Sequence, residues 1–312
     1  MSTREVHRPF YRPYRWAAPG FELGLKPFAW DRWITMEGDY AANMGEKRAR
    51  LAAHPERYYR ALPSSRRAQR ELRARVAEHL LRDHPQHFVR SDAGIRAGAN
   101  GFELALSDEA TDPLLQLSNV IEEDFMLLEA VDGAMQITAA SNVYSSSGRL
   151  VAAVGGGIEW AHATVPTLTT TLGRRIDRIL GSVHPAAPSE RFNWQLTPLP
   201  SIFFPHDNPH AANASAAHGI LAALRSNPER AGDLLWIRVE RQTLSRLPES
   251  GAVAFSLKTY SDPLASIASD RESVLALLAL LRGYSAERLR YSEMDIVYEP
   301  IVAWLESAAR AG

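Results

Sequence analysis

Residues 234–260 read LLWIRVERQTLSRLPESGAVAFSLKTY, and both ends of this stretch are rich in the β-branched and aromatic residues that strands favour. Its middle reads PESG (residues 248–251), which contains three residue types that are common in turns. We therefore expect two strands here, at residues 234–243 and 252–260, joined by a turn.

A second pair of strands is expected further upstream. Residues 122–131 (EEDFMLLEAV) and 135–144 (MQITAASNVY) flank an Asp-Gly dipeptide, which is a strong hairpin signal. A helical stretch at 155–180 and another β-like run at 191–197 (RFNWQLT) follow. Two strands, a helical insertion and three more strands is the order of a PAS-like fold. We therefore predict the α+β class, with a PAS-like antiparallel five-stranded sheet and flanking N- and C-terminal helices.

The remaining sequence indicates helices on both sides of this sheet. Apolar residues recur at helical spacing in several segments. The expected helices are residues 40–51, 65–84, 270–281 and 297–309, the last packed against the one before it. Residues 205–217 are rich in Asn, His, Pro and Ala, so we expect a long loop there. The chain is then one compact unit comprising an N-terminal extended segment with helices (1–115), a PAS-like core (116–262) and C-terminal helices (263–312).

The composition excludes several kinds of chemistry. The chain has 312 residues and no cysteine, so it can form no disulfide, no Cys-ligated zinc site, no iron–sulfur cluster and no thiolate-bound haem. Its formal net charge is −1, which gives no general attraction to nucleic acid. Three of the 35 basic residues are lysines and the others are arginines. We attribute this arginine excess to genome base composition rather than to phosphate binding.

No segment resembles a targeting signal or a membrane span. The arginine-rich start lacks the apolar stretch of about 7–15 residues found in secretory signals. The longest apolar run, residues 274–281, is shorter than the roughly 20 residues that cross a bilayer. We therefore expect a cytoplasmic protein with no membrane partner.

The common catalytic motifs are absent from the sequence. There is no G-x-S-x-G, no H-E-x-x-H and no Walker loop, and Gly155-Gly156-Gly157 lacks the spacing of a dinucleotide fingerprint. A nicotinamide bound to this chain is therefore not expected. If the protein catalyses a redox reaction, its electrons must come from a partner reductase.

Two groups of histidines have simple interpretations. We interpret the histidines at 79, 84 and 87 as solvated residues that cap a helix end, where cations are favoured. The histidines at 206, 210 and 218 could form a metal site, but Pro209 opposes the helical spacing that would direct the first two the same way. A polar loop is the favoured interpretation, and a mononuclear metal enzyme is the alternative.

His162 and a set of arginines are the stronger candidates. His162 lies among Trp160, Ala161 and Val165, so it is either a core histidine or a ligand. In PAS-like folds this insertion lines the cavity, and neutral imidazole is a standard axial ligand for haem iron. The arginines at 238, 241 and 246 fall in the segment RVERQTLSRLP, and Arg191 falls on the neighbouring expected strand. They form either a salt-bridged sheet face or a site for carboxylates such as haem propionates.

Several segments together resemble one known family. The stretch RVERQTLSRLPESGAVAFSLKTYSDPL is similar to the signature of the haem-dependent oxidative N-demethylase alpha-subunit family. FELGLKPFAWDRWITMEGDYAANMGEKRARL, IEEDFMLLEA, WAHATVP and RFNWQL resemble further family elements in the same order. The resemblance covers about residues 20–295. Where the family has Phe-Pro-Ser-x-Trp and Pro-Val-Pro, this chain has NVYSSSGRL and Thr-Val-Pro, so the identity of the substrate stays open.

The resemblance implies a haem-dependent monooxygenase. Such a protein binds haem b, takes electrons from NADPH through a separate flavin (FMN) and 2Fe-2S reductase subunit, and uses O2 to oxidise an N-methyl group of a small amine, releasing formaldehyde. By position, His162 corresponds to the iron ligand. We assign Arg191, Arg241 and Arg246 to the haem propionates from their charge.

Side chains that could hold a cationic amine are aromatic or acidic. The candidates are Glu122, Glu123, Asp124, Trp194 and Tyr260, of which we favour Trp194, Tyr260 and Glu123. The alternatives to an oxygenase are a PAS-like sensor of haem or of a small molecule, and a cofactor-free binding subunit.

Overall fold

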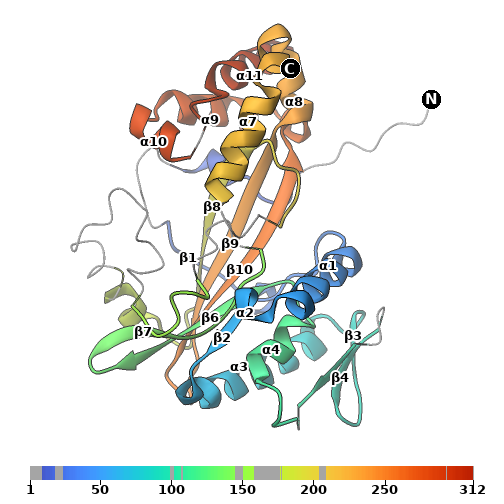
Figure 1. The fold of residues 1–312 in the computed structure, drawn as a ribbon, viewed down its shortest axis with the longest axis vertical. Coiled ribbons are helices and arrows are strands. Elements are labelled where there is room, and N and C mark those ends of the chain that lie inside the picture. The colour runs from blue at the N-terminus through green and yellow to red at the C-terminus, as the bar shows by residue number, and fades with distance from the viewer. Residues whose placement is uncertain are drawn as a thin grey trace. The chain divides into compact units, whose positions relative to one another are not determined.

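The structure is a computed structural model that describes most of the chain (Figure 1). The described residues are 9–17, 24–98, 102–106, 108–144, 150–157, 176, 178–203, 209–292 and 294–311. The α-helices are α1 (Tyr40–Ala53), α2 (Pro55–Tyr58), α3 (Arg66–Asp83), α4 (Pro113–Ser118), α7 (Pro209–Ser226), α8 (Ala231–Leu234), α9 (Arg271–Arg282), α10 (Ala286–Tyr291) and α11 (Tyr298–Ala311). The 3₁₀ helices are η1 (Pro13–Arg15), η2 (Trp30–Arg32), η3 (Pro63–Ser65), η4 (Pro228–Arg230) and η5 (Leu264–Ile267).

A seven-stranded antiparallel sheet forms the main β-structure, in the order β1-β8-β9-β10-β6-β7-β2. Its strands are β1 (Lys26–Pro27), β2 (Tyr59–Ala61), β6 (Asp124–Val131), β7 (Ala134–Ser141), β8 (Ser189–Thr197), β9 (Trp236–Arg246) and β10 (Val253–Pro263). A second sheet contains β3 (Phe88–Arg90), β4 (Gly94–Ala97) and β5 (Glu103–Ala105). The predicted α+β class is confirmed. The five expected strands are the central five of the larger sheet, but a five-stranded PAS-like sheet is not confirmed, because β1 and β2 extend both edges.

Both hairpins predicted from turn residues are present. β6 and β7 pair up to Val131 and Ala134, and the two residues between them, Asp132 and Gly133, have φ values of 50° and 84°. Positive φ at both central positions is typical of the two-residue turn that matches strand twist. At the second turn Leu247 accepts a hydrogen bond from the Gly251 amide at 2.9 Å.

The chain divides into two compact units, each built from separated segments. The first contains residues 1–24, 191–241 and 259–312, and the second contains residues 25–190 and 242–258. Strands β8, β9 and β10 contribute residues to both. The three segments expected from the sequence, with boundaries after residues 115 and 262, stay a prediction.

In the first unit, helices surround one apolar core. Leu277 and Leu281 of α9 and Ile301 and Leu305 of α11 are buried in the same cluster, which confirms the expected packing of these helices. The loop expected at residues 205–217 is wrong from residue 209 on, because α7 begins at Pro209, whereas residues 205–208 lie outside the described residues. Proline is tolerated in the first turn of a helix, because the N–H groups there have no carbonyl acceptor within the helix and the lack of one costs nothing. The alanines that follow Pro209 favour helix.

The second unit contains the predicted helices α1 and α3. Helix α1 begins after Asp39, whose side chain accepts a hydrogen bond from the Ala42 amide at 3.1 Å. Leu72, Val76 and Leu80 of α3 are buried at helical spacing, as the sequence predicted. A separate apolar cluster on the same unit includes Met126, Leu128, Ala140, Val151 and Val154.

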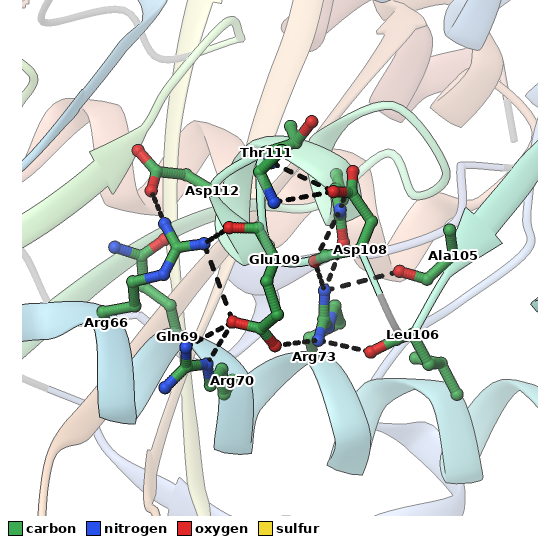
Figure 2. Close-up of polar contacts among 12 residues, drawn as sticks. Arg66, Gln69, Arg70, Arg73, Ala105, Leu106, Asp108, Glu109, Thr111 and Asp112 are labelled. Carbon is green, nitrogen blue, oxygen red and sulfur yellow. Dashed lines mark hydrogen bonds and ion pairs between the residues drawn. The ribbon is translucent and has the colours of Figure 1, made fainter.

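Arginines on α3 hold the segment that leads into α4 (Figure 2). Arg66 pairs with Asp112 at 2.6 Å, and Arg73 donates to the carbonyls of Leu106 at 2.6 Å and Asp108 at 3.0 Å. These guanidinium groups fasten one part of the chain to another. For α3 at least, the abundance of arginine therefore serves the fold.

None of the helices in the described ranges is long and apolar enough to cross a membrane.

Candidate functional site

Three consecutive carboxylates are buried where β6 begins. Glu122, Glu123 and Asp124 are 3%, 1% and 2% exposed, although acidic residues are rarely fully buried without partners. Two lysines, Lys47 and Lys258, supply the partners. We call these five residues the carboxylate cluster; all belong to the second unit. It contains Glu123, one of the predicted site residues.

The Lys47 side chain is fully buried, and its ammonium group forms hydrogen bonds with three consecutive backbone carbonyls. Its Nζ donates to the carbonyl oxygens of Ile121, Glu122 and Glu123 at 3.1, 3.0 and 3.0 Å, and lies 3.0 Å from Asp124 Oδ1. A compact ammonium with three donors suits such converging acceptors better than a planar guanidinium does. Lys47 therefore fixes the start of β6.

Lys258 holds a second carboxylate of the cluster. Its Nζ lies 3.0 Å from Glu122 Oε2 and also donates to the carbonyl of Thr35. The other oxygen of Glu122 accepts a hydrogen bond from Asn43 Nδ2 at 2.7 Å. Burial raises the pKa of the Glu122 carboxyl, and Lys258 opposes this effect.

The carboxylate cluster contains one more carboxylate than ammonium groups. Asp124 accepts hydrogen bonds from the amides of Val143 and Tyr144, both at 2.7 Å, in addition to its pair with Lys47. Burial still raises the pKa of the Asp124 carboxyl. Glu123 Oε1 accepts a hydrogen bond from the Thr35 amide at 2.9 Å, but Oε2 has no hydrogen-bond partner in the described part of the chain. Glu123 thus retains one buried oxygen that can accept a further hydrogen bond.

The two lysines were not identified from the sequence, although a signal was present. Only Lys26, Lys47 and Lys258 are lysines in a chain rich in arginine. Two of these three lie in the carboxylate cluster. In a chain that otherwise uses arginine, a lysine therefore indicates a position where the smaller ammonium group is required.

Trp194 and Tyr260, both predicted site residues, lie in an aromatic group of the first unit. The ring of Tyr14 lies 5.7 Å from Trp194, and the rings of Phe10 and Tyr11 lie 5.4 and 5.0 Å from Tyr260. Tyr260 is buried and Trp194 is half-buried. Residues 9–17 therefore supply the aromatic neighbours of both.

Two of the predicted propionate ligands, Arg191 and Arg241, also belong to the first unit. Arg241 is 1% exposed. Arg191 is half-buried, and its Nε is enclosed without a hydrogen-bond partner among the described residues. Burial lowers the pKa of Arg191, although the charge of Glu240 acts in the opposite direction. Arg191 is therefore a desolvated cation with unused hydrogen-bonding capacity.

Arg246, the third predicted propionate ligand, belongs to the second unit and bonds backbone. Its guanidinium donates to the carbonyls of Val183 and Gly251 at 2.6 Å and of Leu180 at 2.7 Å. These bonds tie the segment at 180–183 to the hairpin of β9 and β10. The structure thus brings Trp194, Tyr260, Arg191 and Arg241 into one unit and Glu123 and Arg246 into the other.

The expected iron ligand, His162, lies outside the described residues, as does His206. No group of three or more His, Asp or Glu side chains within the described ranges is arranged to hold a metal ion. The interpretation of His79 as a solvated cap is wrong. It is 2% exposed, its Nε2 accepts the Ile34 amide at 3.2 Å, and its Nδ1 lies 2.7 Å from Asp83 Oδ2. His84 also contacts the Ile34 carbonyl, at 2.9 Å.

The fold and these buried groups define an α+β protein whose main sheet keeps cationic and anionic side chains out of water, as sites for polar ligands do. A family model described as haem-dependent oxidative N-demethylase, alpha subunit-like, matches residues 24–302. The chain belongs to this family, which confirms the resemblance found in the sequence. The family's description supports haem as a cofactor, and the term alpha subunit implies a complex of several subunits.

Proposed function

We propose that this protein is the haem-binding subunit of an oxidative N-demethylase. It oxidises the N-methyl group of a small amine with O2 and two electrons from a partner reductase. The products are the demethylated amine, formaldehyde and water, with two protons consumed. Arg191 carries this proposal beyond the family assignment, because its desolvated guanidinium has hydrogen-bonding capacity that no described residue uses.

The residues present fit a haem in one testable respect. Haem carries two carboxylates, and a guanidinium bonds a carboxylate through two parallel N–H groups. Arg241 is a buried cation of the first unit, and Arg191 is a half-buried one with an enclosed Nε; these two would hold the propionates. Arg246, also assigned to the propionates from the sequence, bonds backbone carbonyls and would act by fixing residues 180–183.

Haem b, when bound, supplies an iron that activates O2. His162 is the residue that would coordinate this iron through a neutral imidazole nitrogen. The strand order supports a PAS-like core around it, because the two strands before the insertion and the three after it form one antiparallel sheet.

Other residues of the chain would receive the amine and exclude water. Trp194 and Tyr260 present aromatic rings, whose faces attract an alkylammonium cation. Glu123 offers a buried carboxylate oxygen without a hydrogen-bond partner among the described residues. We assign Trp194 and Tyr260 to amine binding in the first unit, and Glu123 is the candidate that the second unit offers for the same role.

The electrons come from another subunit. The chain has no cysteine for an iron–sulfur cluster and no dinucleotide fingerprint. A reductase subunit that carries FMN and a 2Fe-2S cluster and oxidises NADPH would therefore complete the enzyme.

The test compares the absorption spectra of four proteins expressed with haem precursor: wild type, His162→Ala, Arg191→Leu and the control Arg225→Leu. Arg225 is exposed on α7, so its replacement should leave the spectrum unchanged. We expect a stoichiometric Soret band in wild type, a lost or shifted band in His162→Ala, and weakened haem retention in Arg191→Leu. A wild type that stays colourless after reconstitution with hemin would contradict the proposal.

Turnover is tested with the haem-loaded protein, a reductase, NADPH and dimethylamine. Formaldehyde should appear in step with the NADPH consumed. Haem binding without formaldehyde from any of a panel of methylamines would instead indicate a sensor.

A further inference from the structure

A small polar cavity lies at the start of α9, within the first unit. Its volume is about 210 Å³, and it is lined by Arg12, Ser266, Ser269, Asp270 and Arg271. One water molecule occupies roughly 30 Å³ of the liquid, so the cavity has room for a group of several heavy atoms. All five lining side chains are charged or carry a hydroxyl, whereas sites for uncharged organic ligands are mainly apolar. The cavity therefore suits a small, strongly polar group.

Two of the lining side chains carry enclosed polar atoms without a partner. Ser266, in η5, is 8% exposed, and its Oγ has no hydrogen-bond partner among the described residues. The Nε of Arg12 is likewise enclosed and unbonded within the described part of the chain. Most buried side-chain polar atoms in proteins are hydrogen-bonded, so these two donors call for an acceptor. A serine hydroxyl changes direction by rotation about one bond, which lets Ser266 present it to a ligand in the cavity.

Positive charge exceeds negative charge at this cavity. Asp270 is the only carboxylate among the lining residues, and its oxygens are already used. Oδ2 lies 2.8 Å from Arg12 Nη1 and accepts a hydrogen bond from Ser273 Oγ at 2.8 Å, and Oδ1 accepts the Ser273 amide at 3.1 Å. Arg271 is exposed and forms no ion pair with any described residue. The N-terminus of α9 adds the partial positive charge of its dipole.

The donors and the charge together restrict the ligand. Because Ser266, Arg12 and Arg271 all offer donors, the ligand must be an anion with several acceptor oxygens. Phosphate has more acceptor oxygens than a carboxylate has, and both guanidinium groups and helix N-termini bind it well. Phosphate is therefore the anion that this set of donors fits best.

We propose that the cavity at the start of α9 binds a phosphate group, either free or as the monoester of a small molecule. Ser266 Oγ and Arg12 Nε donate hydrogen bonds to its oxygens, and Arg271 supplies charge from the exposed side. This inference goes beyond the proposed function and does not depend on it, because neither haem nor an amine takes part.

Binding is measured by calorimetry at constant ionic strength with three probes: inorganic phosphate, glycerol phosphate and acetate. The variants are Ser266→Ala and Arg271→Ala, and the control is Arg225→Ala, which removes an exposed arginine on α7. Ser266→Ala should weaken phosphate binding about tenfold, because it removes a hydrogen bond to a charged acceptor. Arg271→Ala should weaken it about threefold, as expected for an exposed charge, and Arg225→Ala should leave it unchanged.

The three probes distinguish the possible ligands. Glycerol phosphate that binds more tightly than inorganic phosphate would identify a monoester, and the reverse order would identify free phosphate. Either phosphate should bind more tightly than acetate. The inference would be overturned by the absence of binding of both phosphates at millimolar concentration, by equally tight binding of acetate, or by equal phosphate affinity in Ser266→Ala and wild type.

Melting temperatures without phosphate test whether the Ser266 hydroxyl lacks a partner in the protein. Ser266→Ala should melt at or above the wild-type temperature, because it removes a buried polar group that is unbonded. The matched control is Ser118→Ala. Ser118 is 2% exposed and its Oγ donates to the Leu114 carbonyl at 2.9 Å, so this variant should melt lower. A Ser266→Ala protein that melts as low as Ser118→Ala would also overturn the inference.

Discussion

Replacing Lys47 by methionine tests whether the carboxylate cluster stabilises the fold. Methionine keeps an unbranched apolar chain but removes the ammonium that contacts Asp124 and three carbonyls. Removing one partner of a buried ion pair typically costs about 3–5 kcal/mol, because the other charge stays buried and uncompensated. That is a large part of the roughly 5–15 kcal/mol that stabilises an ordinary domain.

The assay is urea denaturation of wild type, Lys47→Met, Asp124→Asn and the double variant. Asn at 124 still offers an oxygen to the amides of Val143 and Tyr144, so the double variant should be about 1–3 kcal/mol more stable than the sum of the single changes predicts. The control is Glu46→Gln, which removes an exposed pair on the same helix and should cost about 1 kcal/mol or less. A loss below about 1 kcal/mol for Lys47→Met, or strict additivity with Asp124→Asn, would refute the reasoning.

Two further predictions concern the second unit. Burial lowers the pKa of His79 to about 4. As the pH falls, His79 becomes protonated near pH 6.5 in the unfolded chain but only near pH 4 in the folded protein. The contribution of His79 to the free energy of unfolding is therefore complete above pH 6.5, and about 3 kcal/mol of it is lost as the pH drops towards 4. Urea titrations across this range should show the fall in wild type and a smaller one in His79→Gln, and equal falls in both would contradict the assignment. Arg246→Ala removes the bonds to Leu180, Val183 and Gly251. We expect faster amide exchange at residues 178–183 and a loss of about 2–3 kcal/mol, whereas unchanged exchange would show that other contacts fix this segment.

The central sheet could be predicted because its signals are local. The Asp132-Gly133 and PESG turns each fix a hairpin through a few neighbouring residues, and the strands beside them alternate clearly. The edge strands β1 and β2 have two and three residues, too few to show a pattern. The sequence does not reveal helix α7, because its asparagines and its proline are residue types typical of loops, whereas this proline, Pro209, stands in the first turn of the helix.

The candidate site could be predicted only in part, because burial depends on contacts distant in sequence. Glu123 is followed by ordinary strand residues, so nothing next to it in the sequence shows that it is buried. Its contacts are with Thr35 and Lys47, which are distant in sequence. His79 was misjudged for the same reason, since its partner Ile34 lies 45 positions away. Residue type alone could not separate Arg191, with its unbonded Nε, from Arg246, which bonds backbone.

The interleaving of the two compact units has a consequence for synthesis on the ribosome. The second unit lacks part of β9 and β10 until residue 258 has been made, and the first also needs residues 259–312. At about 5–20 residues per second, the aromatic residues at 9–17 wait roughly 10–50 s for Tyr260 to emerge. Neither unit can be obtained by cutting the chain once, and nascent chains stopped before residue 258 should be targets for chaperones and proteases.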